Sequence, residues 1–123
     1  LKDLILVRGQ NLYPQDLEIL LEENIEVLRK GRIAAFAVTH RDGEGIGIAA
    51  EIGRSTQKLV PPQALFDLIN ETLALAYQEP ASVILLLQPG TLPKTTSGKL
   101  QRRACWYDWQ SGVLRPYAVY QSG

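Results

Sequence analysis

The sequence predicts an α+β domain in which two amphipathic helices cover one face of a small sheet. Two segments carry apolar residues at helical spacing, and four shorter segments are rich in branched apolar residues and are bounded by Gly, Pro or charged turns. These segments alternate in the order strand, helix, strand, strand, helix, strand, which favours a two-layer arrangement. We expect an antiparallel or mixed sheet of about three strands, an N-terminal hairpin and an irregular C-terminal segment. The 123 residues suit one compact domain.

The N-terminal part is expected to form a hairpin arm followed by a strong helix. Residues 2–9 alternate weakly and are rich in branched side chains, and residues 9–11 offer turn chemistry. Residues 13–31 read as a helix, with Pro14 in its first turn and Gly31 as its C-terminal stop. The apolar residues of that helix fall on one face: Leu17, Leu20, Leu21, Ile25 and Leu28.

The middle of the chain predicts a β-hairpin and a second helix. Residues 32–40 and 46–53 read as two mostly buried strands around a turn at 41–45. Residues 54–60 form a polar connection, and residues 61–78 read as an amphipathic helix opened by prolines.

The last core element is expected at residues 82–88, which form a short apolar strand closed by Pro and Gly. From Gly90 onward the pattern is irregular. Residues 111–123 have no clear period and read as a tail or linker toward a following domain. The sequence therefore predicts one domain over residues 1–110.

The composition limits the class of function. Thirteen basic residues balance thirteen acidic ones, which argues against a dedicated nucleic-acid-binding domain. A single cysteine, Cys105, forms no internal disulfide and is expected to be buried and inert, in keeping with a reducing, cytoplasmic compartment. The longest apolar run, residues 83–87, is too short to span a membrane, and no His-Cys spacing suggests a metal site. We assign His40 a structural role. The chain lacks an initiating Met and reads as a segment of a longer protein.

A local basic cluster stands out in this neutral chain. Residues 88–107 contain four basic residues and no carboxylate: Lys94, Lys99, Arg102 and Arg103. Gly98 allows close backbone approach, and Thr95, Thr96 and Ser97 supply hydroxyl and amide donors suited to anionic oxygens. A loop ammonium in such a segment can meet negative charge that develops during a reaction. The alternative is an ordinary solvated loop.

Two other interpretations of the cluster are weaker. A phosphate-binding P-loop requires Ser or Thr directly after Gly-Lys, where this chain has Leu100. Single-stranded nucleic acid could stack on the aromatic residues at 106, 107 and 109. We expect these aromatic side chains to pack locally instead.

Residues 92–103, LPKTTSGKLQRR, resemble the closing motif of the adenylate-forming (ANL) superfamily. That superfamily includes acyl-CoA synthetases, adenylation domains of peptide synthetases, luciferases and fatty acyl-AMP ligases. Residues 1–18, LKDLILVRGQNLYPQDLE, resemble the hinge and loop that open the C-terminal domain of the same enzymes. Within the superfamily, VRGQNLYPQDLE looks most like fatty acyl-AMP ligases. The resemblance covers residues 1–105.

The resemblance implies a chemistry of two steps. A fatty acid attacks the α-phosphate of ATP, with Mg²⁺, to give acyl-AMP, and the acyl group then passes to the phosphopantetheine thiol of an acyl carrier protein. ATP and Mg²⁺ would be bound mainly by an N-terminal adenylating domain of the same polypeptide, whose motifs are absent here. We therefore expect no bound cofactor and no useful activity in the isolated domain.

The resemblance also implies roles for individual residues. Lys99 matches the catalytic lysine, and its loop is shaped by Lys94, Thr95, Thr96, Ser97 and Gly98. Lys2, with Asp3, falls at the hinge about which the domain swings between the two steps. Arg8 and Gly9 would lie on the loop that faces the acceptor. A plain strand end is the alternative for these two.

Other family members remain open as alternatives. The chain could be the C-terminal domain of an acyl-CoA synthetase or of a peptide-synthetase adenylation domain. It could also be a non-catalytic module that docks an acidic carrier protein through Arg102 and Arg103.

Overall fold

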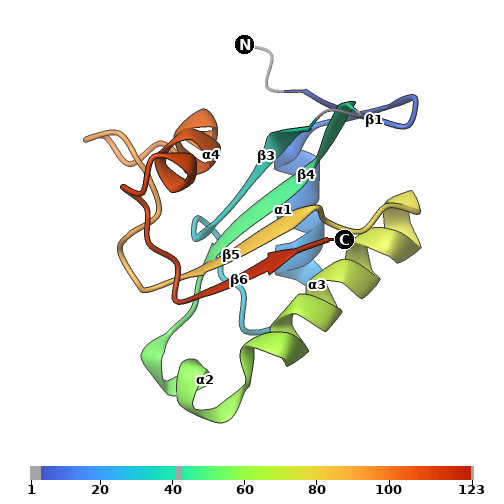
Figure 1. The fold of residues 1–123 in the computed structure, drawn as a ribbon. Helices are drawn as coiled ribbons and strands as arrows, with labels where there is room; N and C mark the ends of the chain where they lie inside the picture. The colour runs from blue at the N-terminus through green and yellow to red at the C-terminus, as the bar shows by residue number, and fades with distance from the viewer. Residues whose placement is uncertain (1–3, 41–42, 123) are drawn as a thin grey trace.

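The computed structural model describes residues 4–40 and 43–122 and confirms the predicted α+β class. The proposed hinge residues, Lys2 and Asp3, lie outside the described residues. A two-stranded hairpin precedes a four-stranded mixed sheet (Figure 1). The elements, in chain order, are β1 (Ile5–Val7), β2 (Gln10–Leu12), α1 (Pro14–Asn24), β3 (Ile33–His40), β4 (Gly43–Glu51), α2 (Arg54–Leu59), α3 (Pro62–Tyr77), β5 (Val83–Leu87), α4 (Arg102–Gln110) and β6 (Ala118–Gln121).

The main sheet has the strand order β3-β4-β5-β6. β3 and β4 form an antiparallel hairpin whose pairing runs from Ile33 opposite Ala50 to His40 opposite Gly43. The connection is therefore shorter than the predicted turn at 41–45. β5 runs parallel to β4, as a crossover through the long helix α3 requires, and β6 is antiparallel to β5.

The fourth strand, β6, lies within residues 111–123, which the sequence predicts to be a tail or linker toward a following domain. β6 pairs along β5, from Leu86 opposite Ala118 to Val83 opposite Gln121. The ring of Tyr120 also packs on Phe66 of α3, with 5.6 Å between ring centroids. β6 is an edge strand with alternating half-buried and exposed residues, so its sequence lacks the apolar run that marks a central strand.

Two helix boundaries also differ from expectation. α1 ends at Asn24, because Ile25 adopts an extended conformation and the Asn24 side chain donates to the Leu20 carbonyl at 2.8 Å. Ile25 and Leu28 remain buried, but they reach the core from a turn. The predicted polar connection at 54–60 contains the short helix α2. α3 agrees with prediction and buries Leu65, Phe66, Ile69 and Leu73.

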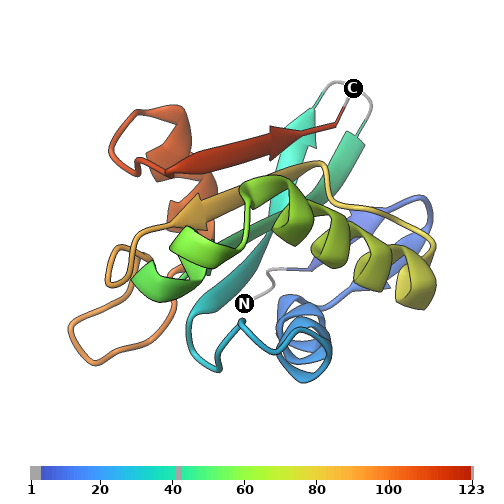
Figure 2. The same ribbon diagram turned by 90° about the horizontal axis from the view of Figure 1, so that it is seen from below.

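Both faces of the sheet are covered. α1 and α3 pack on one face, as predicted, while α4 lies on the opposite side of the sheet (Figures 1 and 2). The α4 face forms a second apolar cluster, which includes Phe36, Leu85, Leu92, Cys105 and Leu114. The sequence predicted only an irregular segment here. Packing of this segment fixes the C-terminal part of the chain to β3 and to the end of β5.

Candidate functional site

Residues 93–101, here called the lysine hairpin, form a closed turn with Lys99 close to its tip. The Gln101 amide donates to the Pro93 carbonyl at 3.0 Å, and the Thr95 amide donates to the Lys99 carbonyl at 2.8 Å. The Gly98 amide returns to the Thr95 carbonyl at 2.9 Å, and Gly98 has a φ of +90°. This is the pattern of a three-residue hairpin loop that ends in a left-handed glycine. The segment predicted to be irregular is therefore an ordered hairpin.

The hydroxyl groups of the lysine hairpin bond within it. Thr95 Oγ1 accepts from the Lys99 amide at 3.1 Å and lies 3.0 Å from Ser97 Oγ. The side chains of Lys94 and Lys99 are exposed, as is Thr96. The structure thus brings together all six residues predicted for this loop, but the Thr95 and Ser97 hydroxyls build the turn. This arrangement differs from the prediction that these hydroxyls offer donors to an anion.

The entry to the lysine hairpin rests on a buried carboxylate. Glu51, the last residue of β4, accepts a hydrogen bond from the Leu92 amide at 2.9 Å through Oε2. Its other oxygen lies 3.4 Å from Nη1 of Arg32, and the Glu51 side chain is only 5% exposed. Glu51 also donates its backbone amide to the Arg32 carbonyl at 2.9 Å. The segment leading into the hairpin is thereby tied to the end of the sheet.

The exit from the lysine hairpin rests on a second buried carboxylate. Arg102, the first residue of α4, forms a two-pronged ion pair with Glu18 of α1, with both N–O distances at 2.7 Å. Glu18 Oε2 also accepts from the Ala35 amide of β3 at 2.8 Å. Arg102 therefore has an anionic partner on this chain, 84 residues away in sequence. The lack of a carboxylate within residues 88–107 therefore does not leave Arg102 without an acidic partner, because the fold supplies Glu18.

Sequence reasoning missed both Glu18 and Glu51 as residues of this site. A weak signal was present for Glu51, because it lies within a strand predicted to be mostly buried, whereas Glu18 lies on a helix predicted to bury only its apolar face. Buried carboxylates are rare unless they are paired. Their partners, however, lie far away in sequence and could not be identified without the fold.

The N-terminal hairpin presents Arg8 and Gly9 at its turn. Both residues have positive φ, +47° and +78°, as the two-residue type I′ turn requires. Arg8 Nε lies 3.2 Å from Glu79, and Gln10 donates to the Tyr77 carbonyl at 2.9 Å, so the turn is held against the end of α3. This turn and the lysine hairpin lie at opposite ends of the domain (Figures 1 and 2). The structure does not gather the predicted residues into one site.

Cys105 is buried, as expected. Burial raises the pKa of its thiol to about 12, and the Asp108 carboxylate adds to this effect. The thiol therefore stays protonated at neutral pH. Its Sγ lies 3.8 Å from the Gln101 carbonyl and packs in the cluster under α4.

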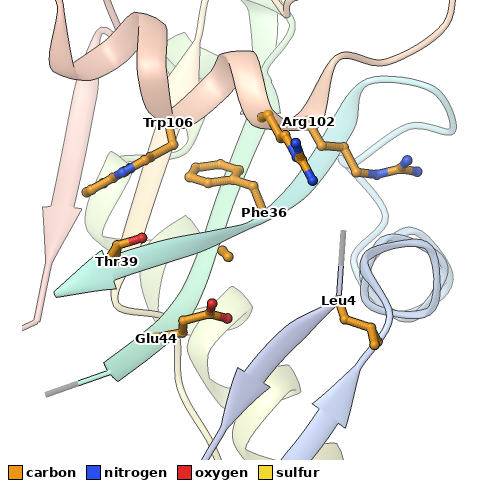
Figure 3. A pocket seen from close by; sticks show the side chains of 8 residues that line it. Leu4, Phe36, Thr39, Glu44, Arg102 and Trp106 are labelled. Carbon is orange, nitrogen blue, oxygen red and sulfur yellow. The ribbon is translucent and has the colours of Figure 1, made fainter. Parts of the chain in front are cut away.

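A cavity of about 360 Å³ lies beside the first turn of α4 (Figure 3). Arg102 and Trp106 of α4, Phe36 and Thr39 of β3, and Glu44 of β4 surround it, together with Leu4, Ala37 and Arg103. Lys99 is not one of its lining residues. The cavity is thus separate from the hairpin tip.

No helix in the described part of the chain combines the length and apolar character that crossing a bilayer demands. Among residues 4–40 and 43–122, no three His, Cys, Asp or Glu side chains group into a metal site.

Comparison with known proteins identifies relatives of this chain. No family model matches it. It is 35% identical over 114 residues to the medium-chain-fatty-acid–acyl-carrier-protein ligase JamA of Moorena producens, with 93% of this chain and 19% of JamA aligned. It is 33% identical over 135 residues to the long-chain-fatty-acid–AMP ligase FadD32 of Mycobacterium marinum, covering 94% of this chain and 21% of the relative.

Solved structures agree with these relatives. A fatty acid AMP ligase from Legionella pneumophila superimposes with a TM-score of 0.72 and 29% identity, over 89% of this chain and 19% of the ligase. McyG complexed with phenylalanyl-adenylate shares the fold with a TM-score of 0.77 at 22% identity, over 91% of this chain and 20% of that one. The chain spans about a fifth of the length of the curated relatives, from 19% to 21%. It belongs to the adenylate-forming superfamily, as a counterpart of the C-terminal domain of fatty acyl-AMP ligases.

Proposed function

We propose that this chain is the mobile domain of an enzyme that activates a fatty acid with ATP and passes the acyl group to an acyl carrier protein. In this proposal Lys99 supplies the positive charge for the first step. The observation that supports it most is geometric: an exposed ammonium stands near the tip of an ordered hairpin whose entry is bonded to β4 and whose exit is bonded to α1. Such a projection can enter a pocket of a neighbouring domain without disturbing its own fold.

The first step forms one bond and breaks another. A carboxylate oxygen attacks the α-phosphorus of ATP, and pyrophosphate leaves with the electrons of the broken P–O bond. Negative charge accumulates on the phosphoryl oxygens, and a preplaced ammonium stabilises it more in the transition state than in the ground state. Lys99 is suited to this task because its side chain is exposed at the end of the lysine hairpin.

This chain alone offers little of the binding surface that such a reaction needs. Mg²⁺ and the ATP phosphates would be held mainly by a larger N-terminal domain, since this chain aligns with only 19% to 21% of the length of its curated relatives. We therefore expect the isolated chain to release no pyrophosphate from ATP and fatty acid.

The second step is proposed to use the opposite end of the domain. Arg8 and Gly9 stand at the turn of the N-terminal hairpin, remote from Lys99. Rotation of the domain about Lys2 and Asp3 would withdraw the lysine hairpin from the pocket of the N-terminal domain and bring the turn at Arg8 and Gly9 there instead. The name of JamA identifies an acyl carrier protein as the acceptor of that relative. We propose the same class of acceptor here, with coenzyme A as the alternative.

The test compares two variants in the full-length enzyme. Lys99→Ala should lower pyrophosphate release by more than about 100-fold, the scale on which single charge-stabilising groups act. Transfer from preformed acyl-adenylate to the holo carrier protein should stay within about two-fold. Lys94→Ala, on the same hairpin, serves as the matched control and should affect adenylation much less. Equal adenylation by the Lys99 variant and the unaltered enzyme would refute the proposal.

A non-catalytic docking module predicts a different result. In that case Lys99→Ala would leave adenylation intact, and Arg103→Glu would weaken binding of the carrier protein. A competition assay with coenzyme A and the holo carrier protein would decide the acceptor.

A further inference from the structure

Each end of the lysine hairpin meets a buried acid that belongs to the sheet or to a helix packed on it. At the entry, the Glu51 carboxylate holds the Leu92 amide at 2.9 Å. At the exit, the Glu18 carboxylate holds Arg102 at 2.7 Å through two bonds. Glu18 and Glu51 are the two buried charged side chains among the described residues. Their placement at the two ends of one nine-residue turn, residues 93–101, calls for a physical explanation.

Stability alone is a poor reason to bury a carboxylate. Removing the charge from water costs several kcal/mol, and well-packed apolar residues often stabilise a fold equally well. The buried charge of Glu51 is compensated only in part by Arg32. The Arg32 side chain is 52% exposed, and its Nη1 lies 3.4 Å from Glu51 Oε1. What the Glu51 carboxylate does provide is a strong, directional bond to one backbone amide. That amide lies directly before Pro93, where the hairpin begins.

The carboxylates of Glu51 and Glu18 differ in the groups that they bind. Glu51 contacts the backbone itself, so its bond fixes the position of the segment that leads into the hairpin. Glu18 fixes the first turn of α4 and, through the Ala35 amide at 2.8 Å, the outer edge of β3. Both connect the hairpin to β3 and β4. The tip, with Lys99, therefore projects from two ends that are each bonded to the folded domain.

From this geometry we infer that Glu51 is a positioning residue for adenylation, which acts on Lys99 through the Leu92 amide. Glu18 performs the matching task at the other end. The inference rests on the proposed catalytic role of Lys99. A displacement of about 1 Å can lower the rate of a positioned reaction by about 100-fold. Loss of the Glu51 carboxylate should therefore act on the adenylation step and spare the transfer step.

The experiment measures both half-reactions in the full-length enzyme. Glu51→Ala should lower kcat for adenylation by about 10- to 100-fold, with KM values for ATP and fatty acid within about two-fold. Transfer from preformed acyl-adenylate to the holo carrier protein should change by less than about two-fold. Glu51→Gln keeps an acceptor oxygen for the Leu92 amide and should recover most of the lost adenylation rate.

Glu44→Ala provides the matched control. Glu44 lies on the same strand and also accepts from a backbone amide, but it is exposed and its bond, at 2.9 Å, is to Leu6 of β1 and not to the lysine hairpin. Adenylation by this variant should stay within about two-fold of the unaltered enzyme. Hydrogen exchange of the Glu51→Ala enzyme should rise in residues 92–101 and remain unchanged in α3.

Three results would overturn the inference. The first is a proportional loss of both half-reactions, which would indicate general destabilisation. The second is unchanged adenylation in Glu51→Ala. The third is insolubility of both Glu51 variants, since the carboxylate would then serve folding. Lys99→Ala in the same assay tests the proposed function separately: if that variant adenylates normally, the role of Lys99 fails whatever Glu51 does.

Discussion

The ion pair between Glu18 and Arg102 gives the most quantitative prediction. It joins α1 to α4 across 84 residues, with both N–O distances at 2.7 Å. The Glu18 side chain is 7% exposed and that of Arg102 is 25% exposed. Glu18 also accepts from the Ala35 amide. Replacing Glu18 with Ala removes three hydrogen-bonded contacts and leaves Arg102 without this carboxylate.

The magnitude follows from burial and geometry. Removing one partner of a buried ion pair typically costs about 3–5 kcal/mol. Arg102 is partly exposed and can regain some water, so we expect the lower end, about 3 kcal/mol for Glu18→Ala. For a domain of this size that loss corresponds to a decrease in Tm of roughly 10 °C.

A double-mutant cycle isolates the interaction. Glu18→Ala, Arg102→Ala and the double variant should give a coupling free energy of about 2 kcal/mol from denaturant unfolding. Glu23→Ala, exposed on the same helix, is the control and should change the unfolding free energy by less than about 0.5 kcal/mol. A coupling energy near zero would refute the claim that the two charges interact strongly across the domain.

Three further predictions concern packing, backbone and pH. Gly47→Ala should lower the unfolding free energy by about 1–3 kcal/mol, because a Cβ at Gly47 would overlap the ring of Phe36; urea denaturation measures this, and an unchanged midpoint would contradict the packing. Gly98→Ala should lower the adenylation rate of the full-length enzyme by more than Gly53→Ala does, because Gly98 has a φ of +90° and Gly53 lies at −60°. The unfolding free energy should fall as pH rises from about 9 toward 12, because the folded thiol of Cys105 has a raised pKa and binds its proton more tightly than the unfolded thiol does. Cys105→Ala should flatten this slope, and an equal slope in both proteins would contradict the burial of the thiol.

The main elements of the fold were readable because local pattern and tertiary role coincide there. α3 begins at a proline and buries a regular stripe, and β5 is an uninterrupted apolar run buried at every position. β6 could not be predicted from the sequence, because it is an edge strand whose residues alternate between half-buried and exposed and form no apolar run. α4 was also missed, since its core contribution comes mainly from Cys105 and two half-buried tryptophans among polar residues.

The candidate site also has one part that the local sequence predicts and another that it does not. The tip of the lysine hairpin follows from local chemistry, because Gly98 is at the one position where the turn requires a left-handed residue. The contacts of Glu18 and Glu51 at the two ends of the hairpin do not follow from local chemistry. Glu18 and Glu51 meet their hydrogen-bond partners at separations of 84 and 41 residues, and only the folded arrangement of α1, β4 and α4 brings these groups together.

The central claim is that Lys99 reaches the reacting groups while the lysine hairpin keeps its form. A structure of the full-length enzyme with a bound acyl-adenylate analogue tests this claim most directly. We expect the Lys99 ammonium to lie within hydrogen-bonding distance of the acyl or phosphoryl oxygens, with Glu51 still bonded to Leu92. A structure set in which Lys99 stays remote from the analogue in every arrangement of the two domains would contradict it.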